Sequence, residues 1–200
     1  MLDLAHQHVV YGRRIKVLAR HVAELLPRDA SVLDVGSGDG LLARRVLDAR
    51  GDLRITGVDV LRRDASHIPV EVFDGSRLPY GDGQFDVVMM IDVLHHAAKQ
   101  DVLLEETVRV AKHAIVIKDH VVKGPFAWDT LRFMDWLGNA RHGVALPYSY
   151  WTEEQWRQQF ARLQLRAVVM RNKLGLYPWP ASLIFERGLH FIAVLERPPA

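Results

Sequence analysis

The chain has 200 residues, of which 49% are hydrophobic and 25% are charged, an ordinary balance for a globular protein that can bury a core. Lys and Arg number 26 against 24 Asp and Glu, and this small excess does not predict a surface for nucleic acid or membrane. The absence of cysteine excludes disulfides and thiolate metal sites.

The N-terminal segment, residues 1–27, is predicted to form one amphipathic helix. Apolar side chains recur at helical spacing over residues 3–26, and Pro27 follows, where a helix can end. The segment lacks the apolar core of a secretory signal, and no stretch of the chain approaches the roughly 18 uncharged apolar residues of a membrane span. We therefore expect a cytoplasmic protein with no membrane span.

Residues 28–119 alternate between strands and helices. Short apolar runs predict strands at 31–35, 53–60, 68–74, 85–91 and 113–119. Amphipathic stretches predict helices at 41–50 and 101–111. Such alternation is typical of a parallel sheet with helices on both faces.

Residues 120–151 interrupt this alternation and predict an inserted cap, because they are rich in aromatic residues, Gly and Pro and lack strand periodicity. The remaining residues, 152–200, predict a helix and two strands. Thr152 is the expected N-cap of the helix, with Gln155 completing a capping box, and the strands are expected at 163–171 and 189–197. The whole chain is thus predicted to form one α/β domain with a seven-stranded, mostly parallel sheet and an inserted aromatic cap.

A glycine-rich loop carries the main functional signal. The sequence VLDVGSGDG (32–40) places glycines between a buried strand and a helix, where they allow a tight turn and close approach of a ligand. Asp59 and Asp74 end the next two predicted strands, and Asp59 is suited to accept both hydroxyl hydrogens of a ribose. Carboxyl ends of parallel strands meet at one edge, so these residues are expected to form one ligand site. The alternative is that they only make turns and helix caps.

NAD is the competing cofactor for such a loop. The dinucleotide fingerprint requires G-x-G-x-x-G, but here the third glycine comes one position early, and Leu41 stands where the fingerprint has Gly or Ala. The spacing therefore disfavours NAD.

With these motifs the chain resembles the class I S-adenosylmethionine-dependent methyltransferases, especially the small-molecule group similar to ubiquinone and menaquinone pathway enzymes. The resemblance extends over residues 30–120 and includes VLDVGSGDG, ITGVDV and VFDGSRLPYGDGQFDVVMMIDVLHH. It implies a Rossmann-like fold. In two places the chain departs from the family. The connection from Asp59 to the third predicted strand is short and falls within residues 60–69, and the Pro-Gly-Gly turn expected before the fifth strand is absent.

The resemblance implies which residues bind S-adenosylmethionine. Those around its methionine part are Asp34, Gly36, Ser37 and Gly38. Asp59 would hold the ribose, Val60 would pack on the adenine, and Asp74 would bind the adenine amino group with Gly75 alongside. Those near the sulfonium are Ile91 and Asp92.

Methyl transfer needs an aligned acceptor and often a base that removes its proton, a task that suits histidine. His120, which follows the fifth predicted strand, is the first candidate base and His96 the second, with His95 and His142 as further candidates. The alternative is that these histidines only cap helices or satisfy backbone groups. No resident metal is expected, although Asp92, Asp119 and His120 offer an alternative metal set, as in metal-dependent catechol methylation.

Residues 129–151 are expected to cover the acceptor pocket. The aromatic side chains expected to form its wall are Trp128, Phe133, Trp136, Tyr148, Tyr150 and Trp151. They favour a small lipophilic or aromatic acceptor, unless they are ordinary core packing of an inserted helix. The sequence IDVLHH after the fourth strand does not resemble the N-P-P-Y type of base-methylating enzymes, and no nucleic-acid partner is expected.

The predicted function is methyl transfer from S-adenosylmethionine to such an acceptor. Two alternatives remain: a non-catalytic S-adenosylmethionine-binding subunit of a larger complex, and a NAD-dependent oxidoreductase.

Overall fold

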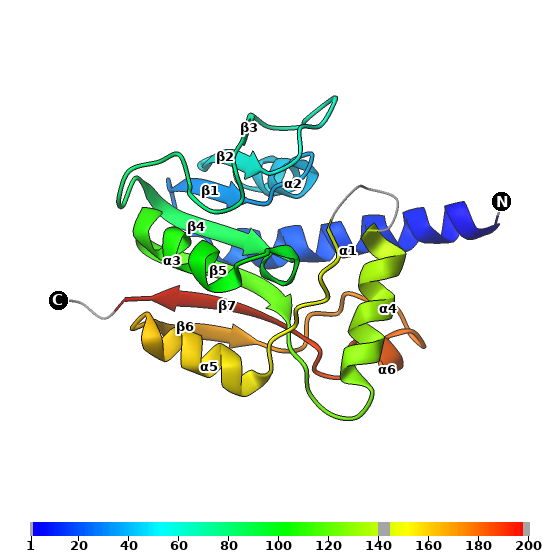
Figure 1. Ribbon diagram of the computed structural model, residues 1–200. Helices are drawn as coiled ribbons and strands as arrows, with labels where there is room; N and C mark the ends of the chain where they lie inside the picture. The colour runs from blue at the N-terminus through cyan, green and yellow to red at the C-terminus, as the bar shows by residue number, and fades with distance from the viewer. Residues whose placement is uncertain (1, 140–144, 198–200) are drawn as a thin grey trace.

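The computed structural model describes residues 2–139 and 145–197 and contains one seven-stranded sheet, with strand order β3-β2-β1-β4-β5-β7-β6 (Figure 1). The strands are β1 (Ser31–Val35), β2 (Arg54–Asp59), β3 (Val70–Val72), β4 (Phe85–Ile91), β5 (Ala111–His120), β6 (Arg166–Arg171) and β7 (His190–Glu196). Strands β1 to β5 are parallel, and β7 is antiparallel to both β5 and β6. The predicted Rossmann-like, mostly parallel sheet is confirmed.

Helices cover both faces of the sheet, as predicted. They are α1 (Leu2–Leu25), α2 (Leu41–Ala49), the 3-10 turn η1 (Leu94–His96), α3 (Gln100–Val110), α4 (Ala127–Asn139), α5 (Glu153–Arg162) and α6 (Ser182–Phe185). Because strand side chains alternate, Val87 and Met89 pack with α1 and α2, while Val88 and Met90 pack with α3 and α5. These two apolar layers hold the sheet in place.

Several element boundaries differ from those predicted. Strand β3 is limited to Val70–Val72 because it lies at the sheet edge and pairs only with the end of β2. Strand β6 begins at Arg166 because the preceding residues, including Gln164 with φ of 54°, turn the chain out of α5. Residues 60–69 form no helix, in keeping with the short connection seen in the sequence.

The insert contains the helix α4, which stands across the carboxyl ends of β4 and β5 (Figure 1). Its inner side packs Ala127, Leu131 and Met134 against Tyr150 and Leu189. Within the described ranges, no helix is both long enough and apolar enough to span a bilayer.

Candidate cofactor and acceptor site

The glycine loop after β1 is fixed against β2 and leaves space at Gly38. The backbone N–H groups of Gly36 and Ser37 both donate to the carbonyl of Val58, at 2.7 and 3.1 Å. A Cβ at Gly36 would lie 2.6 Å from a methyl carbon of Val93, so only glycine fits there. Gly38 has φ of 60°, and a Cβ built on it meets no atom within 4 Å. A ligand can therefore approach the backbone at Gly38.

Asp59 lies directly beside this loop. Its Oδ2 accepts a hydrogen bond from the Gly38 N–H and its Oδ1 accepts one from the Leu61 N–H, both at 2.8 Å. These bonds fix the carboxylate orientation, and its remaining lone pairs can still accept from hydroxyl groups.

Asp34 is a buried carboxyl group next to Asp59. Burial, together with the neighbouring Asp59 charge, raises the pKa of Asp34 to about 8. The nearby Ser37 Oγ is also buried and has no hydrogen-bond partner in the described part of the chain. A cationic ligand beside Asp34 would favour its ionised form, and a polar ligand would satisfy Ser37.

At the end of β2 and after β3, the site offers an apolar surface and a tight turn. The Val60 side chain is 53% exposed, and a Cβ on Gly75 would lie 3.1 Å from it. Asp74 Oδ1 accepts hydrogen bonds from the backbone N–H groups of Ser76 and Arg77, which lower its pKa. Asp74 therefore acts as the cap of this turn, with Val60 available to pack on a flat ring.

Asp92, at the end of β4, is held by two cations. Its Oδ2 accepts from Arg14 at 2.6 Å, its Oδ1 accepts from Lys118, and its backbone has φ of 59°. Burial opposes ionisation, but Lys118 and Arg14 outweigh it and hold the pKa of Asp92 well below its usual range. The preceding Ile91 is partly buried and packs with the α1 side of the core. Sequence reasoning missed Arg14 because it lies 78 residues from Asp92, on α1.

His95 and His120 lie in a buried polar cluster at the carboxyl edge of the sheet. His95 Nδ1 lies 2.6 Å from Asp119 Oδ1, and His95 Nε2 lies 3.4 Å from Asp135 Oδ1 on α4. Burial disfavours the charged ring of His95, but the charges of Asp119 and Asp135 raise its pKa to about 10. Asp135 was not among the predicted site residues, because its segment was expected to cover the acceptor pocket through aromatic side chains.

The rings of His120 and His96 both contact the ring of His95, with centroids 4.4 and 4.0 Å away. His120 is buried, its Nδ1 lies 3.3 Å from His95 Nδ1, and burial together with His95 and Lys118 lowers its pKa to about 4. His96 is partly exposed, and its pKa is lowered by burial and by His95. The fourth candidate, His142, lies outside the described residues. The alternative metal set of Asp92, Asp119 and His120 is not formed, since Asp92 is bound by Arg14 and Lys118.

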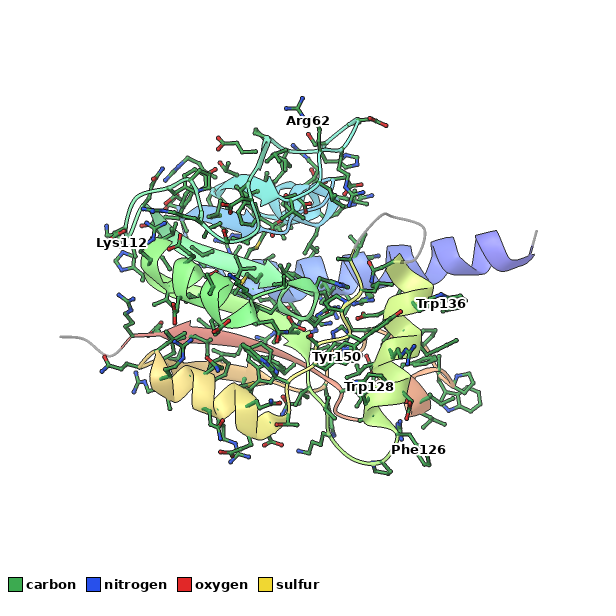
Figure 2. All side chains as sticks on the ribbon, in the orientation of Figure 1. Arg62, Lys112, Phe126, Trp128, Trp136 and Tyr150 are labelled. Carbon is green, nitrogen blue, oxygen red and sulfur yellow. The ribbon has the colours of Figure 1, made fainter. Side chains whose placement is uncertain are left out.

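The expected aromatic wall forms only in part. Trp128, Phe133 and Trp136 are between 42% and 53% exposed on the outer side of α4, because successive helical positions point in different directions. Trp151 packs against Trp156 of α5. Tyr150 lies between α4 and the sheet, where its hydroxyl donates to Asp135 at 2.6 Å (Figure 2).

Comparisons with known proteins identify the family of the chain. A family model described as a methyltransferase domain matches residues 9–169. The chain belongs to this family. The cofactor of this family is S-adenosylmethionine, which is converted to S-adenosylhomocysteine.

Two curated relatives match part of the chain. The 27-O-demethylrifamycin SV methyltransferase of Amycolatopsis mediterranei (strain S699) is 28% identical over 110 residues, covering 48% of this chain and 40% of the relative. An uncharacterized methyltransferase of Mycobacterium sp. (strain JLS) is 31% identical over 127 residues, covering 59% of this chain and 50% of the relative. The chain spans about half the length of these relatives.

Solved structures share the fold. A chain in the complex between the Haloferax volcanii Trm112 methyltransferase activator and the putative methyltransferase has a TM-score of 0.69 and 19% identity, covering 98% of this chain and 97% of that one. The Burkholderia thailandensis 1,6-didemethyltoxoflavin-N1-methyltransferase has a TM-score of 0.64 and 17% identity, covering 93% and 79%. These similarities establish the fold alone.

Proposed function

We propose that this protein transfers the methyl group of S-adenosylmethionine to a small-molecule acceptor. The observation that carries the proposal is the cofactor edge, where the open backbone at Gly38, the oriented Asp59 and the buried Asp34 lie together. When bound, S-adenosylmethionine supplies a methyl group already activated on a sulfonium, so the protein mainly aligns the acceptor.

The residues at this edge suit the separate parts of the cofactor. Asp34 would pair with its positive charges, and Ser37 Oγ would gain a polar partner on the methionine side. Asp59 would accept hydrogen bonds from the ribose hydroxyls while Gly38 and Leu61 hold its carboxylate. Val60 would pack on the adenine, with Asp74 and Gly75 at the ring edge.

We also propose that the acceptor is lipophilic or aromatic and that the chain belongs with small-molecule enzymes of the ubiquinone and menaquinone type. Tyr150 supports the first point, because its ring lies beside His95 and His120. A hollow among Phe133, Trp136 and Tyr148 on the outer side of α4 offers a second aromatic surface. Two of the similar proteins have small-molecule substrates in their names, a demethylrifamycin and a didemethyltoxoflavin.

His120 and His96 are the proposed catalytic residues on the acceptor side. Both lie at the carboxyl edge of the sheet with Asp92, whose Oδ1 is 3.7 Å from His120 Nδ1. Because His120 is buried beside Tyr150, whose hydroxyl is bonded to Asp135 of α4, an acceptor would reach it only if this cap moves. Proton removal is therefore coupled to the position of α4.

Thermal unfolding with S-adenosylhomocysteine tests the proposed cofactor. A ligand at 100 times its Kd stabilises the folded state by about 2.7 kcal/mol, which corresponds to a rise of roughly 5–10 °C in Tm for a chain of this size. We expect S-adenosylhomocysteine to produce this rise and NAD to produce none.

Asp59→Ala serves as the matched variant in the same experiment. Loss of the ribose contact should weaken S-adenosylhomocysteine binding by about 1–3 kcal/mol, whereas Asp64→Asn in the adjoining loop should leave it unchanged. Unchanged affinity in folded Asp59→Ala would show that the ribose assignment is wrong.

A second candidate function is a non-catalytic subunit that binds S-adenosylmethionine and a partner protein. The exposed aromatic residues on the outer side of α4 favour it, as does the fold shared with the complex that contains a methyltransferase activator. Single-turnover methylation of an acceptor by the isolated chain would exclude this second function.

A further inference from the structure

His95, His96 and Asp135 meet where the turn after β4 contacts the inserted helix α4. One ring nitrogen of each histidine and one carboxylate oxygen lie within 4.8 Å of one another. His95 Nε2 and Asp135 Oδ1 are 3.4 Å apart. Two ligands bound tetrahedrally at about 2.0–2.1 Å from one ion are separated by roughly this distance. The spacing therefore fits two ligands of one metal ion.

Among the residues that the structure describes, one nitrogen of the His95 ring, Nε2, makes no hydrogen bond, and its only acidic contact is the long one of 3.4 Å with Asp135 Oδ1. The Nε2 atom is fully buried. A buried polar atom without a partner is unfavourable, so such atoms are uncommon and often indicate a missing ligand. This nitrogen faces Asp135 across the gap where an ion would lie.

The other polar atom of each of the three side chains is held by a neighbour. Asp119 Oδ1 lies 2.6 Å from His95 Nδ1, and the Ala145 carbonyl lies 3.0 Å from His96 Nδ1. The Tyr150 hydroxyl donates to Asp135 Oδ2 at 2.6 Å. Metal-binding histidines usually donate their second N–H to a carboxylate or carbonyl, and metal-binding carboxylates are themselves hydrogen-bonded. All three side chains follow this pattern.

A neighbouring set, His95 with Asp119 and His120, fits an ion less well. The 2.6 Å contact between Asp119 Oδ1 and His95 Nδ1 is a hydrogen bond that leaves no space for an ion. Asp119 also accepts from the backbone N–H groups of Leu94 and His120. Asp119 is therefore the outer partner that orients His95.

We propose that His95, His96 and Asp135 bind one divalent transition-metal ion, with zinc the best match. Two imidazoles and one carboxylate suit zinc and its neighbours in the first transition row, whereas magnesium and calcium prefer oxygen ligands alone. The ion ties α4 to the turn after β4, and three protein ligands leave a fourth position for water. The sequence had suggested no resident metal, because these residues come from segments about 40 positions apart.

The test uses the full chain, stripped of metal by a chelator and titrated with Co²⁺ in the absence of cofactor. We expect Co²⁺ absorption bands in the visible range, with the intensity that is typical of tetrahedral coordination, and we expect them to saturate at one ion per chain. Zn²⁺ should displace the bound Co²⁺, and Mg²⁺ should not. Zn²⁺ at 100 times its Kd should raise Tm by roughly 5–10 °C.

Single substitutions assign the ligands. Asp135→Asn and His96→Gln should each lower Co²⁺ affinity more than about 100-fold, and Asp119→Asn should lower it about 10–100-fold as an outer partner. The matched controls are Asp129→Asn on the exposed side of α4 and His113→Gln at an exposed histidine of β5. Both variants should bind Co²⁺ with the affinity of the wild type.

No saturable binding, or binding that Asp135→Asn and His96→Gln leave intact, would overturn the proposal, since the ion would then be held only by surface histidines. The titration needs neither methyl donor nor acceptor. Its failure is therefore distinct from failure of the methyltransferase proposal.

Discussion

Asp92 illustrates how single residues at the carboxyl edge depend on distant partners. Arg14 approaches it from α1 and Lys118 from β5, so a largely buried anion, with 18% of its side chain exposed, is balanced by two cations. A buried charge that loses its partner is strongly destabilising. The acidic residue that the sequence placed near the sulfonium therefore also links three elements of the fold.

The substitution His120→Ala tests the proposed base at the residue scale. A positioned base contributes about 10²–10⁴-fold to a rate, so turnover should fall by that factor once an acceptor is known. Affinity for S-adenosylhomocysteine should stay unchanged, because the residues proposed to hold its ribose and its methionine part come from β1, β2 and the loop after β1, and the product lacks the sulfonium methyl group that Asp92 would face. His190→Ala, at the position paired with His120 on β7, is the control for loss of a buried histidine. Normal turnover in His120→Ala would show that the His120 ring is not the base and has only a structural role.

At the scale of elements, α5 and α4 show two different uses of a helix. Helix α5 begins at a complete capping box, in which the Gln155 N–H donates to Thr152 Oγ1 and the Thr152 N–H donates to Gln155 Oε1. The two sides of helix α4 differ, because Asp135 contacts His95 of the histidine cluster. Trp136 instead lies exposed to solvent (Figure 2). The first helix supports the sheet and the second covers the site.

The capping box of α5 gives a prediction for stability. Thr152→Ala removes the side-chain acceptor for the Gln155 N–H and should lower the free energy of unfolding by about 1 kcal/mol. For a chain of this length Tm should fall by about 2–4 °C in a calorimetric scan. Thr152→Ser keeps the acceptor oxygen and should keep the wild-type Tm. An equal loss in both variants would mean that the Thr152 methyl group, and not the cap, is responsible.

At the scale of the whole molecule, the ionised form of Asp34 favours cofactor binding but lowers the stability of the free protein. The folded chain keeps the Asp34 proton up to a pKa of about 8, whereas an unfolded chain releases it near pH 3.9. The folded state therefore binds more protons between these values, and the contribution of Asp34 to stability falls as pH rises from about 4 to about 8. A carboxylate that would suit a cationic cofactor thus weakens the free protein at neutral pH.

Asp34→Asn should separate these two effects. The amide cannot ionise, so the Tm of the variant should exceed that of the wild type by a margin that grows between about pH 5 and about pH 8. Its affinity for S-adenosylhomocysteine, which carries an ammonium group, should fall. Parallel thermal scans and titrations over this pH range measure both quantities. A Tm difference independent of pH would show that Asp34 is already ionised in the free protein.

The amino-acid sequence by itself determined the alternation of strands and helices, the glycine loop and its acidic neighbours at the strand ends. These features are local: apolar periodicity selects strand or helix, and glycine spacing selects the turn at 36–40. The parallel order of β1 to β5 then follows, since βαβ connections bring successive carboxyl ends to one edge. The position of the predicted cofactor residues along that edge therefore follows from the sequence alone.

Only the tertiary structure decided what the polar side chains contact. It placed Arg14 on Asp92, set Asp135 and Tyr150 of the insert against His95, and turned Trp136 outward. These contacts join segments far apart in the chain, and their geometry depends on how α1 and α4 pack on the finished sheet. Periodicity shows which side of a helix is apolar, but a polar residue gains its partner only when the elements are assembled, because hydrogen bonds and ion pairs require atoms within about 3–4 Å.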